Sequence, residues 1–292
     1  APIPEAAMKT LDEASKTQLP LPLVDGIPAD TIPVADRGLH YGDGLFETLA
    51  VVDGNPCLWE RHLSRLRDGC ARLAFPPPDE GRLAAEARGL TQGVERGVLK
   101  LILTRGEGGR GYRPPCPARP RRILRLGPWP DYPASWQSAG IRVRYCRTRL
   151  GHQPLLAGLK HLNRLEQVLA RSEWSDPDIA EGLMLDLDGG VVEGTQSNLF
   201  ALLDGRLVTP PLARCGVAGV VRALVLERAP ALGLPVVEER LEPARLETAD
   251  ALFLTSSLIG LWPVRQLAGV ALDPSRVPAT LRAAVLAAAF RP

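Results

Sequence analysis

The chain has 292 residues, of which 45% are hydrophobic and 23% charged, and its formal net charge is +2 at pH 7. This length is enough for two domains with substantial cores, and the near balance of charge gives no reason to expect a nucleic-acid surface. No apolar run approaches the roughly 20 residues that cross a bilayer, and acids and prolines stand where a signal peptide has its apolar region, so we expect a cytoplasmic protein without a membrane segment.

Cysteine and histidine usage bounds the chemistry further. The 5 cysteines are odd in number and none belongs to a Cys-x-x-Cys pair, while the 4 histidines are dispersed along the chain. These spacings argue against a disulfide framework and against a zinc site. We therefore expect no metal.

The first half of the sequence predicts a sheet with one helix between its strands. Residues 1–20 show little periodicity and are interpreted as an N-terminal extension. Residues 45–52 predict a strand, and Asp53-Gly54 is typical of a hairpin turn. A helix with one apolar face follows from Trp59 to Leu73 and is closed by the prolines at 76–78.

A second pair of strands is predicted around a glycine-rich segment. Residues 97–105 form an apolar run whose expected partner is 122–126. Between them, 106–111 matches the Gly-x-Gly-x-x-Gly pattern of dinucleotide sites. The prolines at 114, 115 and 117 exclude the helix that such a site requires, so we reject the nucleotide interpretation.

The second half predicts a larger α+β unit. A strand is expected at 141–145, a helix across the leucines of 159–170, and an antiparallel meander over 180–209 with turns at Asp188-Gly189-Gly190 and Asp204-Gly205. The predicted fold class is α+β, with each domain a sheet flanked by helices. The expected boundaries are a small domain at 21–128, a linker at 129–140 and a large domain at 141–292.

Lys160 is the most informative single residue. It is one of only four lysines among 35 basic residues, and it lies between leucines at the start of the predicted helix. Burial and the positive end of a helix dipole both favour the neutral amine, which can attack a carbonyl to form a Schiff base. The alternative is an ordinary lysine whose ammonium reaches solvent.

Three further segments suggest what that carbonyl belongs to. Glu193 ends an apolar strand, the residues from Cys215 to Arg222 open a helix with free backbone N–H groups, and Thr255 to Ser257 offer hydroxyls. Each has an ordinary structural alternative: an exposed glutamate, a helix start without a ligand, and a turn. Together they match a cofactor with an aldehyde, a basic ring nitrogen and a phosphate, which describes pyridoxal 5'-phosphate.

Four motifs occur in a characteristic order. They are Asp36 to Thr48, His62 to Leu66, Thr104 to Tyr112, and Lys160 to Glu166. In these motifs the chain resembles the fold-type IV pyridoxal-phosphate enzymes, which include branched-chain and D-amino-acid aminotransferases and 4-amino-4-deoxychorismate lyase. The resemblance covers about residues 21–290, is closest to the lyase, and implies a two-domain fold-type IV architecture and a homodimer.

The resemblance also implies roles for individual residues. Lys160 would bind the cofactor covalently, Glu193 would pair with the pyridine nitrogen, and Arg65 would bind the phosphate. Further phosphate contacts are implied from Ser257 and from the backbone N–H groups of Val220 and Val221. Sequence alone would place Arg65 on a solvated helix face, since its helix carries several other arginines.

The reaction depends on one loop. D-amino-acid aminotransferases carry Arg-x-His where this chain has Arg110-Gly111-Tyr112, and this form resembles the lyase, whose dianionic substrate Arg110 and Arg105 would anchor. The implied reaction converts 4-amino-4-deoxychorismate into p-aminobenzoate and pyruvate. Two alternatives remain at this stage: an aminotransferase acting on branched-chain or D-amino acids, and a non-catalytic module that binds phosphate ligands.

Overall fold

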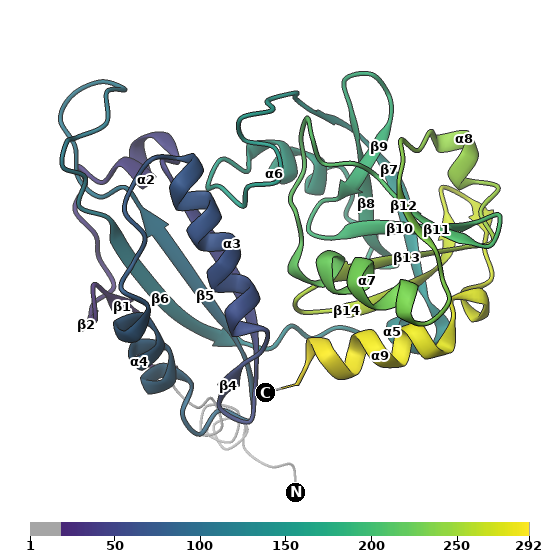
Figure 1. The fold of residues 1–292 in the computed structure, drawn as a ribbon, viewed down its shortest axis with the longest axis horizontal. Helices are drawn as coiled ribbons and strands as arrows, with labels where there is room; N and C mark the ends of the chain where they lie inside the picture. Colours follow the sequence, from purple (N-terminus) through teal and green to yellow (C-terminus); the bar gives the residue numbers. More distant parts are fainter. Residues whose placement is uncertain (1–18, 292) are drawn as a thin grey trace, which may run out of the picture.

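The computed structural model describes residues 19–291, which form two sheets lying side by side, each with its own helices (Figure 1). Apart from Leu19 and Pro20, the expected extension at 1–20 lies outside the described residues. None of the helices within 19–291 is both long and apolar enough to pass through a bilayer.

The first sheet has six antiparallel strands in the order β2-β1-β6-β5-β3-β4. The strands are β1 (Leu23–Val24), β2 (Ile27–Pro28), β3 (Gly44–Val52), β4 (Asn55–Pro56), β5 (Arg96–Thr104) and β6 (Arg121–Pro128). The strands predicted at 45–52 and 97–105, and the pairing of the latter with 122–126, are confirmed. The sheet ends on both sides in a strand of only two residues, β2 and β4.

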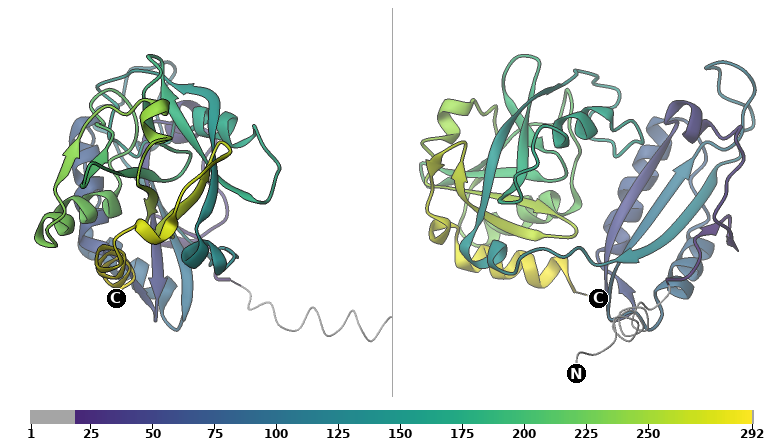
Figure 2. Two further views of the ribbon diagram at one scale, coloured as in Figure 1. Left: turned by 90° about the vertical axis from the view of Figure 1, so that its right-hand side faces the viewer. Right: turned by 180° about the vertical axis from the view of Figure 1, so that it is seen from behind.

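Two helices cover one face of this sheet, as Figures 1 and 2 show from opposite sides. They are α3 (Trp59–Arg72) and α4 (Glu80–Thr91), and a short helix, α2 (Arg37–Tyr41), precedes β3. The predicted apolar face of α3 is confirmed, because Leu63, Leu66 and Cys70 are buried against β3 and β5. No helix follows the glycine-rich segment 106–111, in agreement with the rejected nucleotide interpretation.

The second sheet has nine strands and closes on itself. Its strands are β7 (Ile141–Leu150), β8 (Ile179–Asp186), β9 (Val191–Gly194), β10 (Asn198–Leu203), β11 (Arg206–Thr209), β12 (Val236–Glu238), β13 (Ala251–Ser256), β14 (Gly260–Leu267) and β15 (Val270–Ala271). The path β10-β13-β14-β7-β8-β9 returns to β10 through the pairing of Glu193 with Asn198. The predicted meander over 180–209 supplies four of these strands, β8 to β11.

Helices α7 (Val220–Ala231) and α9 (Ala279–Ala289) pack on the outside of β13 and β14. The remaining helices are α5 (Ser135–Ala139), α6 (Leu165–Arg171), α8 (Pro243–Leu246) and the 3-10 helix η1 (Pro274–Arg276). The connection from β6 to β7 contains α5 and the side chains of Tyr132 and Trp136, which pack edge-on against Trp262. This connection therefore contributes to the wall of the second unit.

The predicted helix across 159–170 is wrong in its first half. The helix α6 begins only at Leu165, and Lys160 lies before it in an extended segment. That segment hydrogen-bonds to β3: the N–H of Phe46 donates to the Lys160 carbonyl at 2.9 Å, and the N–H of Leu162 donates to the Gly44 carbonyl at 3.0 Å. Hydrogen bonds to the first sheet thus outweigh the helical spacing of the leucines. Because Lys160 does not lie in a helix, no helix dipole lowers its pKa.

Candidate active site

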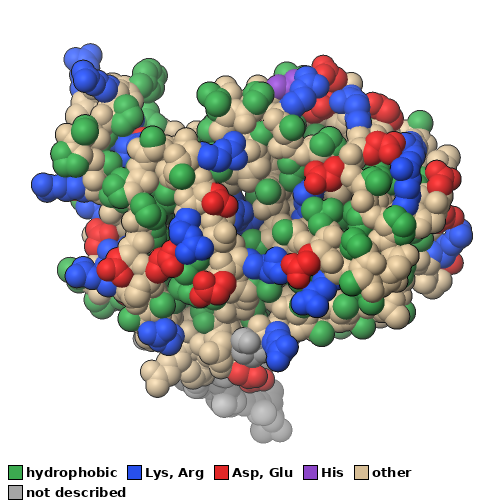
Figure 3. All heavy atoms as spheres, viewed as in Figure 1, with side chains coloured by type: hydrophobic (Ala, Val, Ile, Leu, Met, Phe, Trp, Pro, Cys, Tyr) green, Lys and Arg blue, Asp and Glu red, His purple; other side chains and the backbone are tan. Residues whose placement is uncertain are grey.

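A cavity of about 540 Å³ lies between the two units, and residues from both line it. Figure 3 shows the molecule hollowed between its two lobes, with Lys and Arg side chains beside the opening. Five of the residues predicted for the site line this cavity: Arg65, Lys160, Glu193, Val220 and Ser257. They come from positions up to 192 residues apart in the chain, so the fold brings them together.

Lys160 points its amine into this cavity. Its Nζ lies 4.4 Å from the centroid of the Phe46 ring, which also lines the wall. Burial lowers the pKa of Lys160 to about 8, and the nearby Arg65 guanidinium acts in the same direction. The enclosed amine is therefore partly neutral near pH 7, although no helix dipole contributes. As the sequence predicted, such an amine can act as a nucleophile toward a carbonyl group.

Glu193 is 4% exposed and is held at the point where the second sheet closes. Its Oε2 accepts a hydrogen bond from the N–H of Val217 at 2.9 Å and from Nδ2 of Asn198 at 3.3 Å. Nδ2 of Asn198 also donates to the Val217 carbonyl at 2.9 Å. Burial raises the pKa of Glu193 to about 7, against the opposing effect of the Val217 N–H. A carboxyl in this range readily shares a proton with a basic ring nitrogen.

Arg65 reaches the cavity from α3 and is paired with a buried carboxylate. Its Nε donates to Oε1 of Glu47 at 2.8 Å, and a second nitrogen donates to Oε2. A third donates to the carbonyl of Ala218 at 2.9 Å. Burial alone would raise the pKa of Glu47, but the Arg65 guanidinium and His62 hold it at about 2. The pair is thus a fixed carboxylate and a fixed cation.

The start of α7 completes one side of the cavity. The N-cap residue Gly219 provides no side-chain cap, so the first N–H groups of the helix are available to an anion. Val220 lines the cavity, whereas Val221 is buried behind it and offers only its N–H. A Cβ on Gly219 would lie 2.0 Å from Oδ1 of Asn198, so only glycine fits beside the residue that holds Glu193.

Two side-chain oxygens in the cavity wall have no hydrogen-bond partner within residues 19–291, which is expected where a ligand would supply the partner. They are Oγ1 of Thr255, which is only 1% exposed, and Oε1 of Gln167. Buried polar atoms are seldom left without a hydrogen bond. Together with a cation, free helix N–H groups, a nucleophilic amine and a proton-sharing carboxyl, they suit a phosphorylated aldehyde that carries a ring nitrogen.

Sequence reasoning missed several residues that shape this cavity. Glu47, His62 and Asn198 hold predicted residues in place, while Arg164 lines the wall. Two of them carry a visible signal, because Glu47 interrupts an apolar strand and His62 lies on the apolar face of α3. A charged or titratable residue at a core position is unusual unless it is paired.

Comparison with known proteins identifies the family. The model of the family described as amino-transferase class IV matches residues 44–267. The chain belongs to this family. An aminodeoxychorismate lyase of Vibrio harveyi is 37% identical over 82% of this chain and 89% of its own length. The crystal structure of a 4-amino-4-deoxychorismate lyase from Pseudomonas aeruginosa is 56% identical, has a TM-score of 0.85, and covers 90% of this chain and 96% of that one.

A further solved structure bears on the cofactor. A hypothetical aminotransferase from Mycobacterium tuberculosis, solved in a PLP-bound form, is 25% identical with a TM-score of 0.77 and covers 90% of this chain and 94% of that one. The resemblance to fold-type IV enzymes and the two-unit α+β architecture are confirmed by these matches.

The two arginines predicted to bind substrate lie elsewhere in this class IV chain. Arg105 is 5% exposed, and its guanidinium donates to Asp43 and to the carbonyls of Leu73 and Ala74. It cannot reach a ligand in the cavity without breaking these bonds, so we assign it a structural role in place of the predicted one. Arg110 is exposed on the 106–120 loop and does not line the cavity of its own chain.

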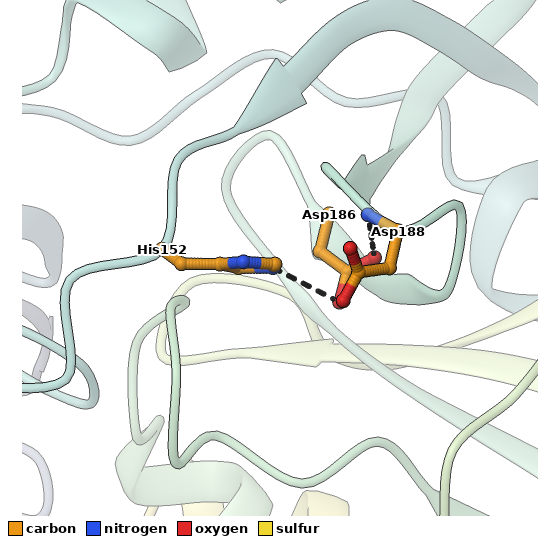
Figure 4. Close-up of side chains that lie close together, drawn as sticks. All are labelled: His152, Asp186 and Asp188. Carbon is orange, nitrogen blue, oxygen red and sulfur yellow. Dashed lines mark hydrogen bonds and ion pairs between the residues drawn. The ribbon is translucent and has the colours of Figure 1, made fainter.

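One cluster among the described residues has the composition of a metal site: His152, Asp186 and Asp188 (Figure 4). Two guanidinium groups already bind its carboxylates, Arg240 at 3.1 Å from Asp186 and Arg214 at 2.7 Å from Asp188. A nitrogen of Arg214 also lies 2.7 Å from Nδ1 of His152. The cluster thus has balanced charge, and we assign it to holding the turn between β8 and β9.

Proposed function

We propose that this protein is a 4-amino-4-deoxychorismate lyase that uses pyridoxal 5'-phosphate and releases p-aminobenzoate and pyruvate. The observation that supports this most strongly is the meeting, in one cavity, of a lysine with its pKa lowered to about 8, a carboxyl with its pKa raised to about 7, and the Arg65 guanidinium beside the uncapped start of α7. The 56% identical lyase of Pseudomonas aeruginosa supports the choice of substrate.

The cofactor would be held at three points. Lys160 would attach to its aldehyde, Glu193 would keep a proton on its ring nitrogen, and Arg65 would bind its phosphate together with the N–H groups that begin α7 and the hydroxyl of Ser257. When bound, the cofactor supplies an electron sink for the pair released at the substrate carbon that bears nitrogen.

The chain's own residues would move the protons. The substrate amine takes the place of Lys160, and the freed, neutral amine then removes the hydrogen on the carbon bearing nitrogen. The bond from the neighbouring carbon to the enolpyruvyl oxygen breaks, and Lys160 or a bound water returns a proton to the departing group, which becomes pyruvate. The products contain all atoms of the substrate, and the gain of an aromatic ring drives the elimination.

We further propose that the active protein is a homodimer. Large apolar side chains are exposed on α6 and near α2, among them Leu165 at 76%, Leu39 at 62% and Tyr112 at 84%. Exposed apolar patches of this kind mark protein interfaces. Arg110 lies on the same loop as Tyr112, is exposed and does not line its own cavity, so we propose that it serves the cavity of a second copy.

The deciding experiment uses purified protein, pyridoxal phosphate and 4-amino-4-deoxychorismate without any keto acid. A lyase returns its cofactor unchanged in each cycle, so pyruvate and p-aminobenzoate should accumulate in equal amounts over many turnovers. An aminotransferase would stop after one half-reaction. Efficient transamination of leucine or D-alanine with 2-oxoglutarate, and no pyruvate from the cyclic substrate, would assign the protein to the aminotransferases instead.

A further inference from the structure

Two titratable side chains lie directly behind the cavity without lining it. Glu47 of β3 and His62 of α3 are each 1% exposed, and neither contacts the space that a cofactor would fill. Both lie among the buried residues of their elements, most of which are apolar. Replacing a buried ionic group by apolar residues of similar size is often neutral or stabilising, so stability alone gives little reason for their presence.

Glu47 fixes the orientation of the Arg65 guanidinium. It accepts from two different nitrogens of Arg65, one to each carboxylate oxygen, which is the bidentate arrangement that fixes a guanidinium most firmly. The remaining terminal nitrogen donates to the carbonyl of Ala218, two residues before α7 begins. The guanidinium is thus held at both ends while one edge faces the cavity.

His62 extends this arrangement to the second sheet. Its Nδ1 lies 2.6 Å from Oε2 of Glu47, and its Nε2 lies 3.3 Å from Oγ of Ser257, which follows β13. Because the Glu47 carboxylate can only accept, Nδ1 carries a hydrogen, and burial lowers the pKa of His62 and so favours the singly protonated ring. Nε2 is then the acceptor for the Ser257 hydroxyl.

The result is one continuous hydrogen-bonded chain between groups of different sheets. It runs from Ser257 through His62 and Glu47 to Arg65, and then to the segment that precedes α7. Arg65 and Ser257, the two side chains proposed to bind the phosphate, are therefore both members of this hydrogen-bonded chain.

We propose that Glu47 and His62 are positioning residues for the cofactor phosphate: Glu47 orients Arg65, and His62 carries that constraint to Ser257 across the two sheets. The inference rests on the proposed use of pyridoxal phosphate. Its specific content is that both residues act on the phosphate end of the site. The Glu47 carboxylate also raises the pKa of Lys160, so loss of its charge favours the neutral amine and should not weaken attachment to an aldehyde.

The test compares two aldehydes that differ only in the phosphate. Apoprotein is titrated with pyridoxal phosphate and with pyridoxal, and attachment to Lys160 is followed by visible absorbance. Glu47→Gln should raise the Kd for pyridoxal phosphate at least about tenfold, equivalent to roughly 1.4 kcal/mol, while the Kd for pyridoxal stays within about twofold. His62→Gln should change the same ratio in the same direction by a smaller factor.

Glu80→Gln is the matched control. It removes a partly exposed carboxylate of α4 that pairs with Arg67 of α3, and neither residue lines the cavity. Both Kd values should remain those of the wild type.

The outcomes separate the two proposals. If wild-type protein binds neither aldehyde, the proposed cofactor and this inference both fail. If it binds pyridoxal phosphate and the variants bind it equally well, or if they lose both aldehydes alike, only the positioning role is overturned. Should Glu47→Gln not fold, Glu47→Asp, which keeps the charge but is too short for the bidentate contact, and His62→Gln decide the question by the same ratio.

Discussion

Two arginine–carboxylate groups lie at β3, one within the strand and one just before it, and they differ in the space beside their guanidiniums. Within the strand, Glu47 binds Arg65, which keeps one edge toward the cavity. Just before the strand, Asp43 binds both Arg37 and Arg105, whose other nitrogens donate to carbonyls of neighbouring loops. Each of the three guanidiniums donates from all three of its nitrogens, so the number of internal bonds does not distinguish the two groups. The comparison teaches that the space beside the pair does: Arg65 lines a cavity of about 540 Å³, whereas Arg37 and Asp43 line one of only about 220 Å³.

The largest expected effect is a loss of turnover on substitution of a residue that lines the large cavity. Lys160→Ala removes the nucleophile, and we expect turnover to fall by about a thousandfold or more, with the melting temperature nearly unchanged. Borohydride treatment of wild-type protein with cofactor, followed by peptide mapping, should place the label on Lys160. A label on Lys100 would contradict the assignment.

A loss of stability and not of turnover is expected at the group formed by Asp43, Arg37 and Arg105. Asp43→Asn leaves Arg37 and Arg105 without their shared carboxylate and should destabilise the fold by about 3 kcal/mol, the lower end for a broken buried pair. Denaturant unfolding measures this loss. The kcat of the folded fraction should change little, and a large loss of kcat without a loss of stability would blur the distinction between the two groups.

Glu193→Gln probes the cavity without removing its nucleophile. The amide cannot keep a proton on the ring nitrogen, so kcat should fall about a hundredfold or more while the cofactor remains bound. The measurement is steady-state turnover at saturating pyridoxal phosphate, with bound cofactor quantified by absorbance. Normal turnover in this variant would refute the role of Glu193.

Arg110→Ala tests whether the 106–120 loop contributes to a substrate-binding cavity. Arg37 binds the carbonyls of Gly111 and Tyr112, so the group that it forms with Asp43 anchors this loop. Loss of a charge-assisted bond worth roughly 1.5–3 kcal/mol should raise KM for the cyclic substrate by at least about tenfold. Arg113→Ala, on the same loop, is the control, and an unchanged KM for Arg110→Ala would remove that residue from the site.

The smallest expected effect is a pH dependence of cofactor attachment. With the pKa of Lys160 lowered to about 8, the neutral fraction of its amine rises about tenfold between pH 7 and pH 9 and then levels off. The initial rate of attachment at low cofactor concentration should follow this curve. A rate that continues to rise steeply above pH 9 would indicate an ordinary lysine pKa.

Much of the first sheet was predictable because its signals are local. An apolar strand segment, a hairpin dipeptide and a one-sided apolar helix lie within 35 residues of one another. The closure of the second sheet was not predictable, because it needs pairings between distant segments, such as that of Val264 in β14 with Ile141 in β7. The start of α6 was mispredicted for a similar reason, since bonds to β3 across more than 100 residues outweigh local leucine spacing.

The candidate site divides in the same way. The chemistry of Lys160 and Glu193 could be inferred from their apolar surroundings, whereas Arg65 required the resemblance because its helix carries other arginines. Arg105 and Arg65 look alike in sequence, and only the three-dimensional partners distinguish them.

The short outer strands of both sheets have a consequence for behaviour at high concentration. In the first sheet the outermost strands are two residues long, and within residues 19–291 the outer strands of the second sheet are β12 and β15, of three and two residues. Long unpaired strand edges are templates for pairing between molecules, and short ones offer few backbone groups for it. Encounters between copies are therefore steered away from backbone pairing and toward side-chain contacts, which can be made and broken without converting the fold into fibres.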